Sequence, residues 1–282
     1  MRIYVSIDAE GLPGVCGVQQ VVPGGRLFEE FRAIATRVVK AVVEELKALG
    51  VEEVWVADSH GDMLNVDYLQ MPRGTVLVRG YPRPICMVTG IDRGFAAAMF
   101  IGYHSAAGTP RSVLDHTFSG RAFHEIRVCG RKASEFYVNA LVAGHFNVPI
   151  ALVAGDDKLE REVEEVAPWV TYVQVKESVS RYATITKPLD EVVEELREGI
   201  QQAVNSVKQG KCKPLKPPRQ PIDLEIVVRK TEYADAIEQI PGMQRIDAYT
   251  LRYLAKNPIE LANVIEIATY VAIAIDTLTQ RR

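Results

Sequence analysis

Apolar and polar positions in the first 155 residues follow two periods, one of two residues and one of about 3.6. Short apolar runs rich in β-branched residues predict buried strands at residues 3–7, 54–57, 75–78, 97–103 and 150–153. Apolar side chains on one helical face predict helices over residues 27–49, ended by Gly50, and over 134–146. Strands alternating with amphipathic helices are typical of an α/β fold, with a mostly parallel sheet flanked by helices.

The second half of the chain is less regular. Its pattern predicts helices over residues 157–166 and 189–207 and from Pro258 onward, and strands at 125–129, 170–175 and 224–228. The strand at 125–129 is predicted to be an edge or hairpin strand. Residues 211–221 are proline-rich and basic, which favours a solvated linker or an extended crossing segment over a binding patch. We therefore expect a catalytic, metal-binding lobe over residues 1–155 and a smaller C-terminal α/β lobe over 156–282.

Composition narrows the class of protein. The 282 residues are 48% hydrophobic and 24% charged, and 33 basic against 36 acidic residues give a net charge of −3. This balance argues against a nucleic-acid binder and against a polybasic membrane-surface protein. The apolar stretch 264–275 contains Glu266 and is shorter than the roughly 20 residues that a membrane-spanning helix needs. No signal peptide is apparent, and the four cysteines have no paired spacing, so we expect a cytoplasmic protein with reduced thiols.

Metal-ligating side chains follow three of the predicted strands. Asp8 and Glu10 come after the first strand, His60 after the second and His104 after the fourth. The carboxyl ends of parallel strands lie along one edge of a sheet, so these groups are expected to converge there. Adjacent carboxylates repel each other unless a cation or a proton lies between them, and zinc commonly combines carboxylates with imidazoles. Each residue could singly serve as a cap or a structural histidine, but their shared position favours a metal site.

The glycine-rich stretch 11–17 also follows a strand and could be taken for a phosphate-binding loop. It has neither the GxGxxG spacing nor a lysine–serine pair, and Pro13 would interrupt such a loop. The glycines are better explained as places where the backbone passes close to the metal site.

Several short motifs in this sequence are similar to those of the zinc-dependent D-aminopeptidase family of the DppA type. The resemblance covers most of the chain in the same order and begins with SxDxEG at residues 6–11. The other matching segments are Asp58-Ser59-His60, Gly102-Tyr103-His104, His116 within LDHT at 114–117, Glu135 with Asn139-Ala140, and VAGDD at 153–157. One departure is Ser134, which stands where a glycine usually precedes the glutamate.

The resemblance implies two Zn²⁺ ions per subunit. Its ligands would be Asp8, Glu10, His60, His104 and Glu135, with Glu135 the ligand most affected by the change at Ser134. Five side chains are more than one catalytic zinc takes, so we expect Asp8 to bridge two ions. Glu10 and His60 would then bind one ion, and His104 and Glu135 the other.

His116 matches the catalytic residue of that family, and we expect it to transfer protons as a general base and acid rather than act as a nucleophile. The function implied is a zinc aminopeptidase that removes the N-terminal residue, a D-residue by resemblance, from short peptides with a free N-terminus through a metal-activated water. The family also implies a homo-oligomer such as a decameric ring. Two alternatives remain open: a binuclear-metal amidase or phosphoester hydrolase acting on another small substrate, and a metal-binding oligomeric module without catalysis.

Overall fold

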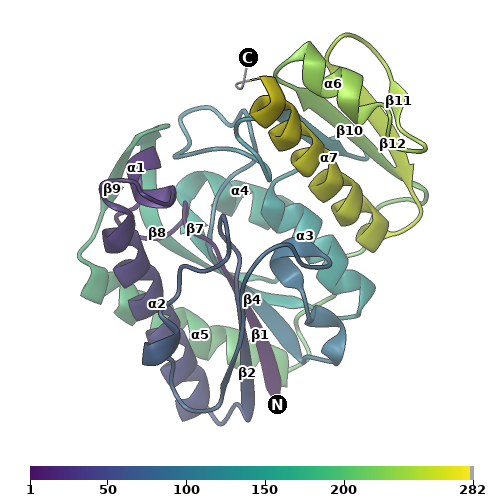
Figure 1. Ribbon diagram of the computed structural model, residues 1–282. Helices are drawn as coiled ribbons and strands as arrows, with labels where there is room; N and C mark the ends of the chain where they lie inside the picture. Colours follow the sequence, from purple (N-terminus) through teal and green to yellow (C-terminus); the bar gives the residue numbers. More distant parts are fainter. Residues whose placement is uncertain (280–282) are drawn as a thin grey trace.

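A seven-stranded sheet in the order β3-β2-β1-β4-β7-β8-β9 is the centre of the computed structural model, which describes residues 1–279 (Figure 1). Its strands are β1 (Arg2–Ile7), β2 (Glu53–Asp58), β3 (Thr75–Val78), β4 (Ala97–Tyr103), β7 (Ile150–Asp156), β8 (Thr171–Ser180) and β9 (Ala183–Thr186). All neighbouring strands are parallel except β9, which runs antiparallel to β8. The predicted α/β class with a mostly parallel sheet is confirmed.

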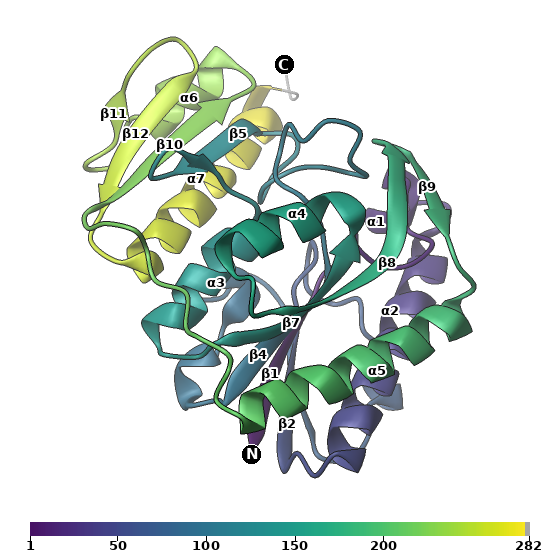
Figure 2. The same cartoon turned by 180° about the vertical axis from the view of Figure 1, so that it is seen from behind.

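Helices cover both faces of this sheet. One face carries α2 (Phe28–Ala48) and α5 (Leu189–Lys208), which contact each other (Figure 2). The apolar positions that predicted α2 are the buried ones, among them Phe31, Val38 and Leu46. The other face carries α3 (Glu135–His145), whose central turns are buried on all sides, and α4 (Asp157–Val166). A short helix, α1 (Val18–Val21), lies beside α2.

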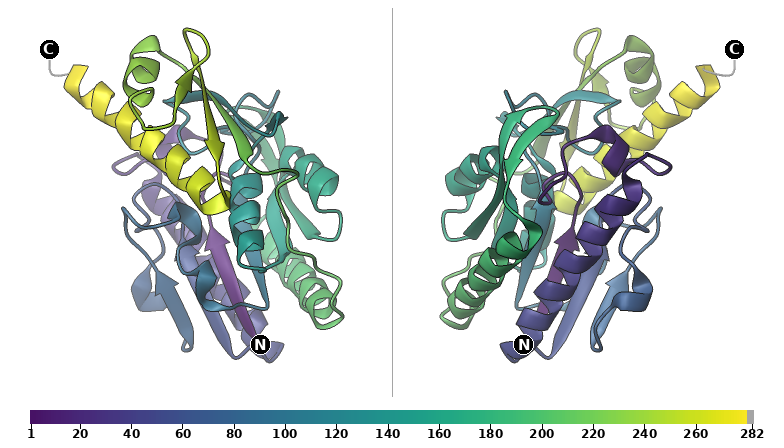
Figure 3. Two further views of the ribbon diagram at one scale, coloured as in Figure 1. Left: turned by 90° about the vertical axis from the view of Figure 1, so that its right-hand side faces the viewer. Right: turned by 90° about the vertical axis from the view of Figure 1, so that its left-hand side faces the viewer.

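A second, antiparallel sheet forms the smaller lobe. Its order is β11 (Gln244–Arg245), β12 (Thr250–Ala255), β10 (Ile222–Val228), β5 (Phe123–Val128) and β6 (Arg131–Lys132). Helices α6 (Thr231–Ile237) and α7 (Pro258–Thr279) pack against β10. In Figure 1 and Figure 3 this lobe lies beyond the carboxyl ends of β1 and β4, so it faces the edge where we expect the site.

The two sheets do not divide at residue 155, where we expected the lobes to separate. Strands β5 and β6 precede that position but belong to the smaller sheet, while β8, β9 and α5 follow it and belong to the larger one. The physical reason is that the β5–β6 hairpin buries Phe123, Ile126 and Val128 against β10, which the chain supplies a hundred residues later. Strand β5 is therefore an interior strand as well as part of the predicted hairpin.

Residues 211–217 have no regular structure and cross from α5 to the second lobe, as the proline-rich composition predicts. This segment packs closely on α3, because a Cβ on Gly144 would lie 1.7 Å from the carbonyl oxygen of Leu215. The ammonium of Lys216 donates to the carbonyl of Gly144 and to Asn147 Oδ1. The crossing segment is thus fixed against the larger lobe.

Helix α7 is long and apolar enough, by composition, to cross a membrane, but half of its most apolar window is buried within this fold. It contacts α3, α6, β10 and β12, so it is a core helix of the smaller lobe. Two acidic side chains, Glu266 and Asp276, are buried on this helix. Asp276 accepts hydrogen bonds from Lys230 and the hydroxyl of Tyr233, which accounts for its burial.

Candidate metal centre and active site

The ends of three adjacent parallel strands bring the predicted ligands together. In the register of the sheet, Ile7 of β1 lies beside Asp58 of β2 and Ile101 of β4. The residues that immediately follow these strands therefore leave the sheet side by side, which places Asp8, His60 and His104 around one point. This agrees with the expectation drawn from parallel-strand topology.

Two glycines allow the ends of β1 and β4 to approach more closely than other residues would permit. A Cβ on Gly11 would lie 1.8 Å from the carbonyl oxygen of Tyr103, and one on Gly102 would lie 2.3 Å from that of Asp8. The amide of Gly11 donates to the carbonyl of Gly102 at 2.7 Å. Gly102 also has a φ of +73°, a conformation that glycine adopts readily. Both glycines of these motifs serve the geometry of the site.

Each of three histidines at this edge uses one ring nitrogen on a backbone carbonyl. His60 Nε2 is 2.7 Å from the oxygen of Val21, His104 Nδ1 is 3.0 Å from that of Ser105, and His116 Nδ1 is 2.8 Å from that of Leu114. Because a carbonyl oxygen can only accept, the nitrogen beside it carries the proton in the neutral ring, and this assigns the tautomer. The other nitrogen of each ring is left with its lone pair, as in metal-ligating histidines.

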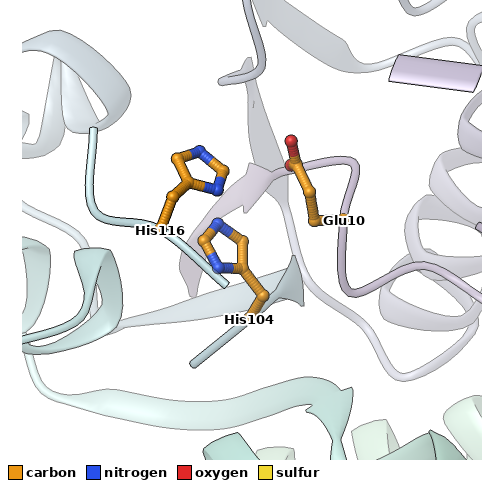
Figure 4. A group of neighbouring side chains, drawn as sticks. All are labelled: Glu10, His104 and His116. Atoms are coloured by element: carbon orange, nitrogen blue, oxygen red, sulfur yellow. The ribbon is translucent and has the colours of Figure 1, made fainter. Parts of the chain in front are cut away.

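The lone-pair nitrogens point at carboxylates. His60 Nδ1 lies 3.4 Å from Asp8 Oδ1 and 3.1 Å from Glu10 Oε2. His104 Nε2 lies 3.5 Å from Asp8 Oδ2 and 3.7 Å from Glu135 Oε1. His116 Nε2 lies 3.5 Å from the same Glu135 oxygen, and its ring is stacked on that of His104 with centroids 4.3 Å apart. Figure 4 shows these two rings facing each other with Glu10 close by.

Glu135 enters the cluster as the first residue of α3. The N-cap is Ser134, whose hydroxyl accepts from the amide of Tyr137, so the serine at this position forms a regular helix start. One oxygen of Glu135 accepts from the amide of Phe118 at 2.6 Å, which ties the helix to the loop that carries His116. The departure at Ser134 therefore does not move Glu135 away from the other predicted ligands.

The charges in the cluster are crowded. Burial raises the pKa of Asp8, and the carboxylate of Glu10 raises it further, to about 7. Burial opposes ionisation of Glu10 too, but the imidazole of His60 outweighs it and holds the pKa of Glu10 well below its usual value. For His104, burial lowers the pKa, yet Glu135 and Asp8 outweigh burial and raise it to about 9. The buried carboxylates in this cluster therefore repel one another unless protons or positive charges lie between them. A bound divalent cation would supply that positive charge.

His116 differs from the other two histidines in its electrostatics. Burial lowers its pKa, and the neighbouring His104 lowers it further, so the ring is held neutral. A neutral imidazole with Nδ1–H bound to a carbonyl presents Nε2 as a base.

The cluster contains two sets of three ligand atoms that share Asp8. Asp8, Glu10 and His60 form one set and Asp8, His104 and Glu135 the other, with atoms within 4.8 Å of one another. A third set joins Glu10 and His104 to His116. Within residues 1–279, three polar atoms of these sets are buried and have no hydrogen-bond partner: Asp8 Oδ2, Glu10 Oε2 and His104 Nε2. Unpaired buried carboxylate and imidazole atoms are costly unless a ligand satisfies them, so these residues fit bound metal ions well.

The structure also identifies residues that our reading of the sequence missed. The ammonium of Lys176 is buried and donates to the carbonyls of Glu10, Leu12 and Val15, so it holds the loop that follows the first strand. Burial lowers the pKa of Lys176 to about 8. Alternation through Val173 and Val175 predicts that Lys176 faces the other side of the strand, but the pairing of β8 with β7 shifts register just before Lys176 and the lysine is buried.

Polar residues of the matching motifs that do not face the ligand cluster form a hydrogen-bonded network around it. The hydroxyls of Ser6 and Tyr103 are 2.8 Å apart, as are those of Ser6 and Ser59, and Asn139 Nδ2 donates to Tyr103 Oη at 3.2 Å. These residues lie on β1, the loop after β2, β4 and α3. The network therefore links the four elements that supply the cluster.

Other histidines and acids considered as candidates lie elsewhere. His124 and His145 are exposed and belong to none of the ligand sets. Asp115, next to His116, accepts from the amide of Gly108 and pairs with Arg181. It therefore does not orient the ring of His116, a role that Leu114 fills through its carbonyl.

A cavity of about 370 Å³ opens beside the cluster. Its walls contain Asp8, His60, His116 and Glu135 on one side and residues of α7 on the other, and apolar side chains such as Met63 and Ile273 line it as well. In Figure 3 (left) helix α7 runs past the end of β1, which is why the smaller lobe supplies a wall of this cavity.

Comparison with known proteins gives one consistent result. The model of a peptidase family described as D-aminopeptidase matches residues 1–267. A D-aminopeptidase of Bacillus subtilis (strain 168) is 33% identical over 275 residues, which cover 96% of this chain and 98% of that protein. The solved structure of the Zn-dependent D-aminopeptidase DppA from Bacillus subtilis, described as a self-compartmentalizing protease, superposes with a TM-score of 0.91 at 32% identity, covering 97% of this chain and 98% of that one. The chain belongs to the D-aminopeptidase family of peptidases.

Proposed function

We propose that this protein is a zinc-dependent D-aminopeptidase that binds two Zn²⁺ ions per subunit and removes the N-terminal residue of short peptides. The observation that carries the proposal is the pair of ligand sets that share Asp8, together with the orphaned buried atoms among them. Family membership supports the reaction, and the zinc dependence of the solved relative supports the metal.

The proposed ligands divide as the two sets do. Glu10 and His60 would hold one ion, His104 and Glu135 the other, and Asp8 would bridge them. When bound, such a pair of ions polarises the substrate carbonyl and lowers the pKa of water, which supplies a nucleophile near neutral pH. The backbone carbonyls of Val21 and Ser105 fix the tautomers of the two histidines, so that the correct nitrogen faces the metal site.

His116 is proposed to move the proton. Its Nε2 would accept a proton from the attacking water and return it to the departing amine, and the carbonyl of Leu114 holds the ring in the tautomer that this requires. The low pKa of this imidazole suits a base that must be unprotonated before the reaction starts. Such proton transfer typically contributes a factor of about 10² to 10⁴ in rate.

The walls of the cavity favour a peptide over a phosphoester as substrate. No lysine or arginine is among the residues that line it within residues 1–279. Transferring phosphoryl groups are usually held by cationic side chains or metal clamps, and the apolar walls suit an amino-acid side chain better.

We also propose that the protein assembles into a homo-oligomer, with a decameric ring as the specific expectation. Support comes from the self-compartmentalizing character of the solved relative. Exposed apolar side chains on the hairpin β8–β9, namely Val179, Tyr182 and Ile185, offer contact area for such an assembly. Light scattering on the purified protein tests this expectation directly.

The function is tested by elemental analysis of the purified protein combined with hydrolysis of D-alanine amide and L-alanine amide. We expect two zinc ions per chain, preferential hydrolysis of the D-amide, loss of activity with a chelator and recovery when zinc is restored. A metal-free protein with full activity, or equal hydrolysis of both amides, contradicts the proposal.

A further inference from the structure

Glu266 is the charged residue that interrupts the most apolar stretch of the sequence, and the mechanism above gives it no role. It lies on α7 and its side chain is buried, with a relative exposure of 7%. Glu266 is nevertheless among the residues that line the cavity, together with Asp8, His116 and Glu135. A buried acid on the wall of a substrate cavity requires an explanation, because desolvating a carboxylate is unfavourable without a partner.

No cation of the described chain is paired with Glu266. Within residues 1–279 its carboxylate accepts from the hydroxyl of Tyr270 and lies beside the thiol of Cys86, and it forms no ion pair. The neighbouring guanidinium of Arg83 donates instead to the carbonyls of Asp58, Val78 and Cys86. Burial raises the pKa of Glu266 accordingly.

Asp276, on the same helix, gives the contrast. It is buried to a similar degree, but Lys230 pairs with it at 2.9 Å and the hydroxyl of Tyr233 donates to the same oxygen. Within residues 1–279, Asp276 is therefore paired with a cation, whereas Glu266, on the wall of the cavity, is not. A positively charged ligand in the cavity would pair with Glu266 as Lys230 pairs with Asp276.

Aromatic rings beside Glu266 suit the same ligand. Tyr81 and Tyr270 both line the cavity, with ring centroids 5.4 Å apart in an edge-to-face arrangement, and Phe118 lines it as well. The faces of aromatic rings attract ammonium groups, and a carboxylate beside such rings is a favourable site for an alkylammonium. No lysine or arginine of residues 1–279 is among the residues that line the cavity, although the guanidinium of Arg83 lies near Glu266.

We propose that Glu266, flanked by Tyr81 and Tyr270, binds an ammonium group of the substrate's N-terminal residue. The ammonium is either the α-ammonium common to all unblocked peptides or the side-chain ammonium of a basic residue. This proposal rests on the proposed aminopeptidase function.

The test compares wild type with Glu266→Gln on D-alanine p-nitroanilide and D-lysine p-nitroanilide. Glutamine keeps the shape and can still accept from Tyr270, but it carries no charge. Because a hydrogen bond to a charged group typically contributes 1.5–3 kcal/mol, we expect KM to rise roughly 10- to 100-fold while kcat stays within about threefold. A rise with both substrates assigns the α-ammonium, and a rise with D-lysine p-nitroanilide alone assigns the side-chain ammonium. Unchanged KM for both, or a fall in kcat alone, overturns the proposal.

Two further measurements keep the test independent of folding and of the proposed function. The matched control is Glu198→Gln, which removes an exposed carboxylate of α5 that makes no hydrogen bond or ion pair within residues 1–279, and it should leave both KM values unchanged.

Calorimetric titration with D-alanine amide and D-lysine amide measures ammonium binding without turnover, at a temperature where circular dichroism shows the variant folded. If wild type hydrolyses neither anilide, the aminopeptidase proposal fails on its own. Equal affinity of wild type and Glu266→Gln for both amides then separately overturns the role of Glu266.

Discussion

Two buried aspartates lie at the ends of β1 and β2, one residue apart in the register of the sheet, and their surroundings differ completely. Asp58, with 1% exposure, accepts from the amides of Asn65 and Val66 through one oxygen and from Asn65 Nδ2 through the other. Asp8, with 3% exposure, has an oxygen for which the described part of the chain offers no hydrogen-bond partner, and it lies beside Glu10, a second carboxylate. The first aspartate is satisfied by its own chain, whereas the second is not.

This difference separates a structural carboxylate from a ligand. Both sites have the same residue type, are buried and lie near a strand end, so none of these properties identifies the metal ligand alone. The distinguishing property is whether backbone and side-chain donors of the fold already occupy the carboxylate. Asp58 fixes the loop that carries His60, and Asp8 is left for a cation.

Replacing Asp8 by Asn should have the largest effect on zinc binding and activity. The variant keeps the shape of the side chain but loses the anionic oxygen proposed to bridge the metals, so we expect zinc binding to fall and turnover to drop to background. That loss should exceed the roughly 10- to 100-fold effect of removing groups that only orient ligands. Elemental analysis and kcat/KM on D-alanine amide measure it.

The same variant should leave the metal-free protein at least as stable as metal-free wild type. Burial and Glu10 raise the pKa of Asp8 to about 7, so above that pH the ionised carboxylate destabilises the empty fold. Urea unfolding at pH 8 in the presence of chelator tests this. Marked destabilisation of the metal-free variant would mean that Asp8 is a structural residue like Asp58.

His116→Ala should remove activity by another route. We expect a fall in kcat of about 10² to 10⁴ with the zinc content of wild type, because the imidazole is proposed to move a proton and not to hold metal. His116 also lies within ligand distance of Glu10 and His104, so its zinc content is the informative measurement. Loss of one zinc ion per chain would assign His116 to the metal shell.

The sequence predicted the convergence of Asp8, His60 and His104 better than it predicted the architecture around them. Parallel topology follows from local periodicity, and it brings Asp8, His60 and His104 to one edge wherever the rest of the chain goes. The β5–β6 hairpin depends on pairing with β10, about a hundred residues away, and no local pattern encodes that partner. For this reason the interleaving of the two sheets across residue 155 was not foreseen.

Buried charged residues show the same limit. Lys176 appears in the sequence as one lysine in a strand, and only the fold reveals the three carbonyls that it binds. Glu266 likewise appears as an interruption of an apolar helix. A buried charge can be suspected from such patterns, but its partner comes from distant segments and requires the structure.

Asp58→Asn should destabilise the fold without removing a metal ligand. Whichever way the amide is oriented, its NH₂ group would face a donor: the amides of Asn65 and Val66 in one orientation, Asn65 Nδ2 in the other. Leaving such donors unsatisfied in a buried site should lower the free energy of unfolding by about 2–3 kcal/mol. Urea unfolding measures this, and zinc content at saturating zinc should equal that of wild type. A variant as stable as wild type but deficient in zinc would reverse the assignments of Asp8 and Asp58.

Glu162 adds an intermediate case, a carboxylate that has donors but is still desolvated. It accepts from the amide and hydroxyl of Ser134, while burial raises its pKa to about 7. Since the folded state binds this proton more tightly than the unfolded chain, the stabilisation is fully present below about pH 4.5 and is lost as the pH rises through 7.

Glu162→Gln should therefore gain about 1–3 kcal/mol in the free energy of unfolding relative to wild type between pH 5 and 8. Urea unfolding across that range measures the difference, and Glu164→Gln, an exposed neighbour on α4, serves as the control for loss of a surface carboxylate. A pH-independent difference for Glu162→Gln would mean that the two donors of Ser134 fully compensate its burial, as the donors around Asp58 do.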